Sequence, residues 1–430
     1  MPPGMRIRTV ELFAGVGGFR LGLKQAGPEF DTVWWNQWEP GAKVQHAWKC
    51  YVKNWHDGDE NAAPALSNTD ISKVPAKAIP PHDLLVGGFP CQDYSVATTL
   101  DKAGGLQGKK GVLWWEIDRI VKARKPPYII LENVDRLLKS PAQQRGRDFG
   151  VVLACLRDAG YRVEWRVINA AEYGHPQRRR RTFIFAAHKS TAIGKRIAEQ
   201  HADADYLESS GFFPGAFPVS FVAVDKRHLD ADTVLPKSLK AVSDSFEYPF
   251  QNAGVMVDGD IHTRLVDPVP QMHKPTIEGL LVKTGVDARY LLDEQALPKW
   301  KYQKGAKRIL RTAKNGHQYH FTEGGMQFPD LPNQPARTIL TSEANRTPNR
   351  STHIVQDPAT GKLRFLTPLE VERLMGFDDD WTEGIPERWR YFTMGNALVV
   401  PVVAGIGQQF TKWLSQPRAA APTPRLPQRS

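Results

Sequence analysis

Four side chains with the capacity for chemistry lie beside short apolar runs of the chain. Cys91 follows "DLLVGGFP", Glu132 follows "PPYIIL", and Arg179 and Arg181 come just before "TFIFAA". A thiolate is a usable nucleophile where positive charge or amide dipoles lower its pKa, and a carboxyl can donate a proton where burial raises its pKa. Alternate residues of an extended segment point the same way, so Arg179 and Arg181 would share one face. The combination indicates a catalytic centre rather than a solvated basic surface.

The composition narrows the class of protein without identifying it. The 430 residues carry a net charge of +11 and a pI near 9.4, which favours a polyanionic partner, although ribosomal, nuclease and membrane-surface proteins share this balance. Cys50, Cys91 and Cys155 form no CxxC pair, so we predict neither a disulfide framework nor a metal site. No uninterrupted apolar run approaches membrane-spanning length and no secretory signal is evident, so we expect a cytoplasmic protein.

The elements that must position these residues alternate between strands and helices. "RIRTVELFAG", "DTVWWNQWE", "HDLLVGG", "PPYIILENV" and "RRRTFIFAA" are typical of buried strands, and "FRLGLKQAG", "VLWWEIDRIVKAR" and "FGVVLACLRDAG" have helical spacing. This alternation predicts an α/β fold with a doubly wound parallel sheet covered by helices on both faces. The carboxyl ends of such strands meet at one edge, which would bring Cys91 and Glu132 together.

The first glycine loop predicts a site for a nucleotide-like cofactor at the same edge. Gly15, Gly17 and Gly18 separate the first strand from the first helix, where the backbone can approach a ligand and helix amides can face it. The next strand ends near Gln37 and Glu39, either of which is a candidate to hold a ribose hydroxyl. Because the spacing is not GxGxxG, a tight turn without any ligand remains the alternative.

The regular alternation stops near residue 187, and this break suggests an inserted domain. In the last part of the chain, "TPLEVERLMGF" predicts a helix with Thr367 as its N-cap. We expect residues 1–187 to form the first part of a catalytic domain, 188–335 an inserted domain of mixed structure, 336–414 the closing part of the catalytic domain, and 415–430 a disordered tail.

Five ordered motifs resemble those of the DNA cytosine-5 methyltransferases. They are "ELFAGVGGFR", "FPCQDYS", "LENV", the pattern QxRxR at Gln177, Arg179 and Arg181, and "GNALVVPV". The resemblance covers nearly all of the chain outside the insertion. It implies a Rossmann-like sheet that binds S-adenosylmethionine, with the insertion as a target-recognition domain. The chain departs from the family at Gln37, where many members have an acidic residue.

The family's chemistry implies a role for each reactive residue. The Cys91 thiolate would add to C6 of a cytosine flipped out of DNA, Glu132 would bind N3 and the 4-amino group, and Arg181 would bind O2. Arg179 would brace this loop. The resemblance further implies cofactor contacts at Phe13, Ala14, Gly15, Gly17, Gly18, Gln37, Trp38, Glu39, Asp70, Ile71, Pro90, Leu113 and Asn396.

Two basic segments are expected to contact DNA. By resemblance, the segment after Cys91 is a loop that closes on DNA, and its lysines would contact phosphates. In the insertion, "KWKYQKGAKRILRTAKNG" interleaves basic and aromatic residues, which favours nucleic acid, although a merely solvated charge run is the alternative. The expected DNA-binding residues are Gln92, Ser95, Lys109, Lys110, Gln177, Trp300, Lys304, Lys307, Arg308, Arg346 and Arg350.

The sequence therefore predicts an enzyme that methylates C5 of a cytosine in a specific double-stranded DNA sequence. We expect a restriction-modification methylase or a solitary or phage methylase, acting as a monomer away from membranes. A cognate restriction endonuclease would act on the same site without a stable complex. An RNA cytosine-5 methyltransferase, a nucleotide-dependent oxidoreductase and a silent DNA-binding relative are the alternatives. The long insertion argues against an RNA methyltransferase, and the combination of motifs argues against an oxidoreductase. The presence of both Cys91 and Glu132 argues against a catalytically silent relative.

Overall fold

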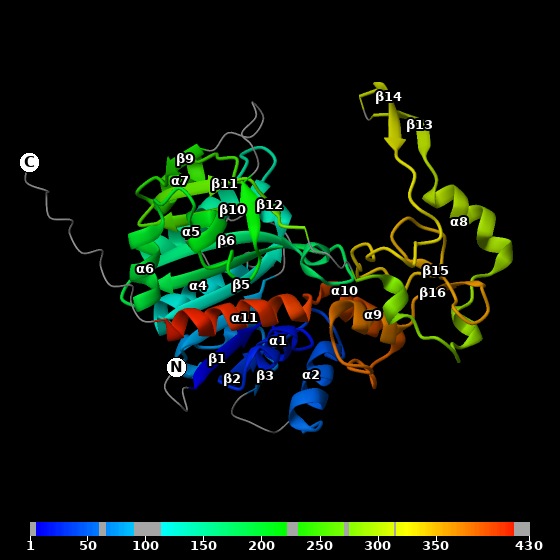
Figure 1. Ribbon diagram of the computed structural model, residues 1–430, viewed down its shortest axis with the longest axis horizontal. Helices are drawn as coiled ribbons and strands as arrows, with labels where there is room; N and C mark the ends of the chain where they lie inside the picture. The colour runs from blue at the N-terminus through cyan, green and yellow to red at the C-terminus, as the bar shows by residue number, and fades with distance from the viewer. Residues whose placement is uncertain are drawn as a thin grey trace, which may run out of the picture.

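Two lobes of unequal size make up the molecule (Figure 1). The larger lobe holds a central sheet, and the smaller lobe lies beside one edge of that sheet. We use the name small lobe for the described residues between 275 and 398. The computed structural model describes residues 6–59, 66–89, 113–221, 231–270, 275–313 and 315–416.

Ten strands form the central sheet in the order β3-β2-β1-β4-β5-β7-β6-β10-β11-β9. The first five in that order are parallel, and every later pairing is antiparallel. This arrangement confirms the predicted α/β fold with its Rossmann-like sheet. The sheet is mixed, however, and not parallel throughout as we expected, because β7 runs antiparallel to β5 and to β6. The strands are β1 (Ile7–Leu12), β2 (Phe30–Asn36), β3 (Leu66–Ser67), β4 (Leu84–Gly88), β5 (Tyr128–Val134), β6 (Tyr161–Asn169), β7 (Arg180–His188), β9 (Ala231–Val234), β10 (Ala253–Val257) and β11 (Asp260–Arg264).

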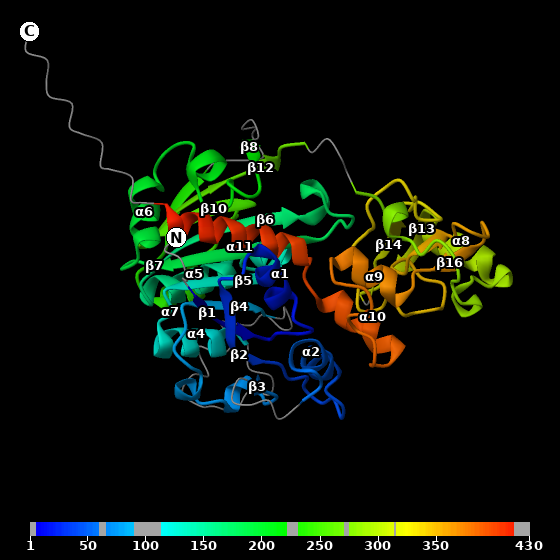
Figure 2. The same cartoon turned by 60° about the horizontal axis from the view of Figure 1, so that its bottom comes forward.

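Helices cover both faces of the sheet because its central strands are apolar on both sides (Figure 2). One buried cluster joins the sheet to α1 (Gly18–Ala26), α6 (Ala192–Gln200) and α11 (Val400–Ser415). The other joins it to α4 (Leu113–Arg124), α5 (Arg147–Asp158) and α7 (Leu239–Ser245). Beside the edge strands, α2 (His46–His56) packs its aromatic residues against β2.

The stretch Glu387–Ser415 is long and apolar enough, by length and composition, to cross a membrane, but 67% of its apolar window is buried inside the molecule. Its second half, α11, packs tightly on α1. A Cβ placed on Gly22 would lie 2.6 Å from Cβ of Val403, so glycine permits this close approach. The apolar surface of α11 is therefore used by the core of the large lobe.

The sheet extends beyond the boundary that the sequence predicts. We expected the first part of the catalytic domain to end at residue 187, where the regular alternation is lost. Instead, β10 pairs with β6, and β11 and β9 continue the same sheet. Antiparallel hairpins carry no crossover helix, so their sequence lacks the alternation by which the earlier strands were recognised. A separate small sheet joins β8 (Val219–Phe221) to β12 (Val266–Pro268).

The small lobe contains both the end of the predicted insertion and most of the segment 336–414, which we expected to close the catalytic domain (Figure 2). As predicted, Thr367 caps α9, and the Glu370 carboxylate bonds back to the cap. Glu370 also pairs with buried Arg364 at 2.7 Å, which ties α9 to the small lobe. The elements are α8 (Leu297–Lys304), β13 (Lys307–Thr312), β14 (Gln318–Glu323), β15 (Ile354–Gln356), β16 (Leu363–Phe365), α9 (Pro368–Met375) and α10 (Glu387–Asn396).

A substitution at Gly254 tests whether β10 belongs to the main sheet. A Cβ at this position would lie 2.0 Å from Cζ2 of the buried Trp165 on β6. We expect Gly254→Ala to lower the free energy of unfolding by about 1–3 kcal/mol, because the overpacked indole must shift. Gly279→Ala is the control, since a Cβ there meets nothing within 4 Å. Equal urea midpoints for the two variants would contradict this packing.

Candidate active site

An ion pair between Glu132 and Arg181 lies at the carboxyl edge of the sheet. Glu132 is near the end of β5, and Arg181 is near the start of the neighbouring antiparallel strand β7. Nε of Arg181 lies 2.8 Å from Oε1 of Glu132, and the two side chains are 17% and 12% exposed. Two residues that are 49 positions apart in the chain therefore form one charged unit with limited access to water.

The environment of Glu132 favours the protonated carboxyl. Burial raises its pKa, while the guanidinium groups of Arg181 and Arg179 oppose that rise. On the neighbouring strand, a Cβ placed on Gly88 would lie 3.2 Å from Oε2 of Glu132. The glycine thus leaves the carboxylate room at the end of β4. A carboxyl whose pKa is raised in this way holds its proton to a higher pH than a free glutamate does.

The strand that leads to Cys91 is tied to the strand of Glu132. Nδ2 of Asn133 donates a hydrogen bond of 2.9 Å to the carbonyl of Phe89, which lies two residues before Cys91. Phe89 itself is buried. The order of strands thus brings the end of β4 beside Glu132. The predicted residues Pro90, Cys91, Gln92, Ser95, Lys109 and Lys110 lie outside the described residues.

Arg179 joins three separate segments of the chain at this edge. It is 2% exposed, and its Nη1 and Nη2 donate to the carbonyls of Ile339 and Gly395 at 3.0 and 2.9 Å. Burial and the nearby Arg181 hold its pKa well below the usual range, against the pull of Glu132. The contacts of the buried guanidinium support the predicted bracing role.

The loop braced by Arg179 runs close to the end of α10. A Cβ on Gly395 would lie 2.3 Å from the amide nitrogen of Thr341, so the glycine of the "GNA" motif allows the two segments to touch. Asn396, a predicted cofactor residue, follows directly and is exposed. The two segments of the small lobe that accept hydrogen bonds from Arg179 thus pack directly on each other.

Gln177 does not face DNA as the sequence predicted. The residue is fully buried, its Nε2 donates to the carbonyl of Leu374 and contacts Sδ of Met375, and its Oε1 accepts from the amide of Ile339. With all of its polar atoms used inside the molecule, Gln177 joins the two lobes. The sequence could not reveal this role because its partners are 162 to 198 residues away.

The glycine loop adopts the conformation that a ligand site requires. Gly15 and Gly17 have φ values of +57° and +90°, in the left-handed region that favours glycine. A Cβ on Gly17 would lie 2.7 Å from Nε1 of Trp55, whereas a Cβ on Gly15 would meet nothing within 4 Å. The loop is therefore packed below Gly17 and open at Gly15, at the N-terminus of α1, where helix amides favour electron-rich ligand groups. This opening fits the nucleotide-like cofactor that the motif predicts.

The two ribose candidates, Gln37 and Glu39, differ in their surroundings. Oε1 of Gln37 accepts from the Gly15 amide at 2.7 Å, so this side chain holds the glycine loop. Glu39 is half-buried, and its carboxylate accepts from the amide of Ala47 at 3.3 Å in the first turn of α2. Burial raises the pKa of Glu39. Both side chains thus support the loop and the helix that border the opening at Gly15.

The remaining predicted cofactor residues border the same edge in different ways. Phe13 has a φ of 54°, an uncommon conformation for a non-glycine residue. The Asp70 carboxylate is used to cap its own turn, where it accepts from the Ser72 amide. The others are buried Ala14, Gly18 and Ile71, half-buried Trp38 and Leu113, and exposed Asn396.

A buried glutamate below the glycine loop was not singled out from the sequence. Glu11, near the end of β1, is 1% exposed, and its Oε2 accepts from the Tyr51 hydroxyl at 2.8 Å. Tyr51 stacks on Trp35, with ring centroids 3.6 Å apart. Burial raises the pKa of Glu11 to about 7, opposed by Tyr51 and Arg20. Two signals could have marked Glu11: it is a charged residue within the apolar run "TVELF", and it is the first residue of the motif "ELFAGVGGFR".

Four of the predicted DNA-binding residues in the small lobe serve the structure of that lobe instead. Trp300 is fully buried in a small core with Leu292, Ile354 and Phe365. Nζ of Lys304 is buried and donates to the carbonyls of Arg350 and Thr352. The expected direct contacts of Trp300 and Lys304 with DNA are therefore wrong, because neither side chain reaches the surface.

Arg346 and Arg350 are likewise used within the lobe. Arg346 pairs with Glu387 at 3.1 Å, and its guanidinium lies over the ring of Phe365. Arg350 donates to the carbonyls of Gln303, Gly305 and Gly324. The sequence marked Arg346 and Arg350 only by their positive charge, whereas the groups that they contact in the folded lobe determine their role. Of the predicted basic residues, Arg308 is exposed and Lys307 is half-buried.

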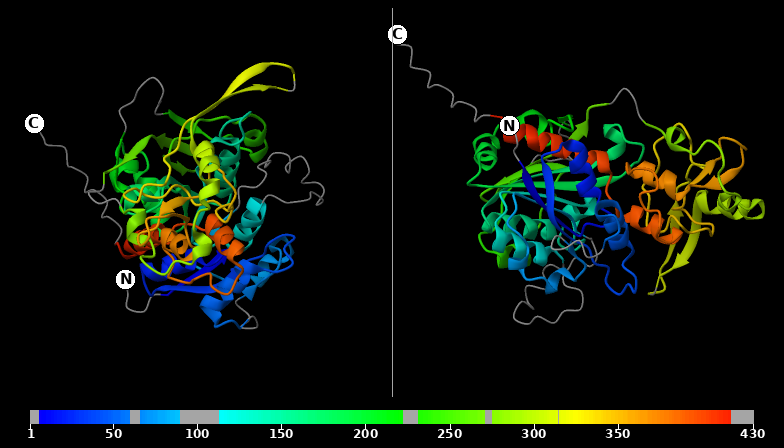
Figure 3. Two further views of the ribbon diagram at one scale, coloured as in Figure 1. Left: turned by 90° about the vertical axis from the view of Figure 1, so that its right-hand side faces the viewer. Right: turned by 90° about the horizontal axis from the view of Figure 1, so that it is seen from below.

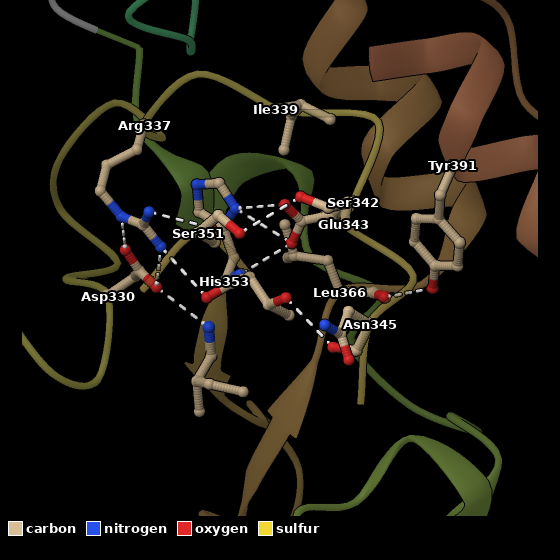
Figure 4. Close-up of polar contacts among 12 residues, drawn as sticks. Asp330, Arg337, Ile339, Ser342, Glu343, Asn345, Ser351, His353, Leu366 and Tyr391 are labelled. Carbon is tan, nitrogen blue, oxygen red and sulfur yellow. Dashed lines mark hydrogen bonds and ion pairs between the residues drawn. The ribbon is translucent and has the colours of Figure 1, made fainter. Parts of the chain in front are cut away.

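A polar network shapes the loop that carries Ile339 to Arg179 (Figure 4). His353 and Glu343 form a fully buried pair, with Nδ1 3.0 Å from the carboxylate. Arg337 pairs with Asp330 at 2.8 Å. Because these polar contacts fix the loop, the Ile339 carbonyl is presented to Arg179 in a defined position.

Comparisons with known proteins agree with the geometry. The family model for C-5 cytosine-specific DNA methylase matches residues 7–412. The Type II methyltransferase M.Sau3AI of Staphylococcus aureus is 48% identical over 414 residues, which cover 95% of this chain and 96% of the relative. The Type II methyltransferase M.HhaI of Haemophilus parahaemolyticus is 34% identical over 178 residues, covering 41% of this chain and 48% of that protein.

A solved structure shares the fold. The Dnmt2 methyltransferase of S. pombe superimposes with a TM-score of 0.57 at 17% identity, covering 96% of this chain and 100% of that chain. At this identity the likeness concerns the fold alone.

The buried Glu11 predicts a pH-dependent stability. Its pKa of about 7 lies above the ordinary value of 4.5, so the folded state binds this proton more tightly than the unfolded state. The stabilising contribution of this tighter proton binding to the free energy of unfolding is fully present below pH 4.5 and is lost as the pH rises through 7. Glu11→Gln keeps the acceptor for Tyr51 without the charge, so we expect it to exceed the unsubstituted protein in stability by roughly 3 kcal/mol above pH 7.

Urea unfolding between pH 5 and 8 measures this difference. The control is Glu383→Gln, whose carboxylate is 67% exposed and should give an offset that hardly changes with pH. A constant difference between Glu11→Gln and the unsubstituted protein over the whole range would contradict the prediction.

Proposed function

The chain belongs to the C-5 cytosine-specific DNA methylase family, and we propose that it transfers a methyl group to C5 of a cytosine flipped out of a specific double-stranded DNA sequence, with Cys91 as the nucleophile. The observation that carries the proposal is the buried pair of Glu132 and Arg181 at the end of β5. The hydrogen bond from Asn133 to Phe89 supports it, since the chain continues from Phe89 to Cys91.

Each polar group has a task in this reaction. Sγ of Cys91 bonds to C6 as the C5–C6 double bond opens, and the electron pair makes C5 nucleophilic. Protonated Glu132 donates to N3 and accepts from the 4-amino group, which draws electrons from C6. Arg181 binds O2. After C5 is methylated, H5 leaves as a proton, the double bond re-forms and the C6–S bond breaks.

The glycine loop is the proposed site of S-adenosylmethionine, which when bound supplies an electrophilic methyl group. Gly15 and the N-terminus of α1 would face its methionine portion, and Trp38 its adenine ring. Glu39 and Nε2 of Gln37 are the groups with hydrogen-bonding capacity left for the ribose. The open space at Gly15 supports this assignment.

We further propose that the protein protects DNA as part of a restriction-modification system. The relatives that cover most of the chain are named Type II methyltransferases. In this proposal the enzyme acts as a monomer in the cytoplasm, and the partner endonuclease recognises the same DNA sequence without a stable complex. Sedimentation of the enzyme alone and with DNA tests the monomer.

Mapping 5-methylcytosine in mixed-sequence DNA tests the reaction itself. We expect label from S-adenosylmethionine to enter DNA at one sequence and not to enter tRNA. Cys91→Ser should retain DNA binding and transfer little or no methyl group, because a hydroxyl is a far weaker nucleophile than a thiolate. DNA with 5-fluorocytosine should trap the unsubstituted enzyme covalently and leave Cys91→Ser free. Label confined to tRNA would overturn the proposal.

Glu132→Gln separates proton donation from binding. The amide cannot deliver a proton, so we expect kcat to fall by about 10²–10⁴ while the Kd for S-adenosylmethionine is retained. The matched control is Asp135→Asn, which removes an exposed carboxylate from the same edge and should leave kcat within about twofold of normal. Equal kcat for the unsubstituted enzyme and Glu132→Gln would remove Glu132 from the mechanism.

A further inference from the structure

Strands β13 and β14 form an antiparallel ribbon that projects from the small lobe (Figures 1 and 3). They make a two-stranded sheet of their own. Such a hairpin is only marginally stable by itself, so its orientation depends on the base from which it emerges. The ribbon runs from Lys307 to Glu323, and all but one of its positions are described.

Buried polar contacts fix the base of this ribbon. Lys304, just before β13, donates to the carbonyls of Arg350 and Thr352. Arg350 in turn donates to the carbonyl of Gly305 before the ribbon and that of Gly324 after it, and lies 3.6 Å from the carboxylate of Glu323. The two ends of the ribbon are therefore held together and attached to the lobe.

The two faces of the ribbon differ in their surroundings. On one, which we term the covered face, the guanidinium of Arg311 lies 3.8 Å above the ring of Phe321, and Nζ of Lys307 lies 4.8 Å from the ring of Tyr302. Both cations of this face thus contact an aromatic ring, and Lys307, Phe321 and Glu323 are half-buried, although Arg311 is exposed. Alternation along the paired strands gives the covered face Lys307, Ile309, Arg311, Tyr319, Phe321 and Glu323.

The opposite side, which we term the open face, consists of exposed residues. Leu310 is 55% exposed at its centre, opposite His320. Arg308 and Gln318 lie near its two ends, on different strands. The full set is Arg308, Leu310, Thr312, Gln318, His320 and Thr322.

We propose that the open face enters the major groove of the substrate DNA and reads base edges there, so that it determines which sequence is methylated. This inference rests on the DNA methylase function. The major groove is about 12 Å wide and admits a two-stranded ribbon. Arg308 suits a guanine edge, Gln318 suits an adenine edge, and Leu310 can pack on a thymine methyl group. The positive charge of Arg308 and Arg311 suits the surrounding phosphates.

Two arginines on opposite faces of the same strand provide a matched test. Arg308→Ala and Arg311→Ala each remove one positive charge from an exposed ribbon, so the general attraction to DNA weakens equally. Only the first removes a base contact. The substrate is the sequence at which the unsubstituted enzyme deposits 5-methylcytosine, compared with its single-base variants. Thermal unfolding and S-adenosylmethionine binding are measured for both variants and should not change.

The two variants have distinct expected outcomes. Arg308→Ala should lower kcat/KM on the mapped sequence by about ten- to a hundredfold and reduce the discrimination against the variant sequences at one base pair. Arg311→Ala should weaken all sequences alike, by a few-fold at moderate salt, with discrimination unchanged. Gln318→Ala should relax discrimination at a second base pair.

Unchanged discrimination in both Arg308→Ala and Gln318→Ala would overturn the assignment of the open face, as would a larger loss of discrimination in Arg311→Ala. A failure of the proposed function can be told apart from a failure of this assignment. If the unsubstituted enzyme leaves DNA unlabelled, the methylase reaction itself is contradicted before any variant is compared.

Discussion

The guanidinium of Arg179 is buried where the start of β7, the loop of Ile339 and the end of α10 meet. A buried cation is costly unless it is hydrogen-bonded, and two carbonyls from distant segments accept from Nη1 and Nη2 of Arg179. The catalytic edge of the large lobe and the loop of the small lobe are thereby held together. Because Arg181 follows two residues later on the same strand, the position of its pair with Glu132 depends on this attachment.

Burial of charge recurs on both sides of the catalytic edge. Glu132 is held beside two guanidinium groups, which lower its pKa while burial raises it, so a carboxyl able to hold a proton lies within a cationic site. Below the glycine loop, Glu11 is buried beside Tyr51, whose hydroxyl donates a hydrogen bond to its carboxylate, and burial raises the pKa of Glu11 to about 7. The two carboxyls thus have different neighbours: Glu132 borders the proposed base site, and Glu11 lies below the glycine loop that is the proposed cofactor site.

In the small lobe, the tertiary structure gives the basic residues two different roles. Lys304 and Arg350 donate hydrogen bonds to backbone carbonyls at the base of the ribbon. Arg308 is left exposed on the open face, and Arg311 is stacked on Phe321. Lys304 and Arg350 hold the base of the ribbon in place, which would give the proposed contacts of the open face with DNA a defined position.

The sequence by itself determined the fold class and, through the order of its motifs, the family, because strand alternation and motif order are local properties. It did not determine the pairing of Glu132 with Arg181, because a parallel sheet would place the start of the Arg181 strand at the opposite edge, and only the antiparallel direction of β7 brings the two side chains together. It could not place β9 to β11 in the main sheet, since antiparallel hairpins lack the strand–helix rhythm. Nor could it assign Gln177, Trp300 or Lys304, which were expected on DNA and are buried. Only the tertiary structure decided their roles, because a polar side chain takes its function from partners far away in the chain.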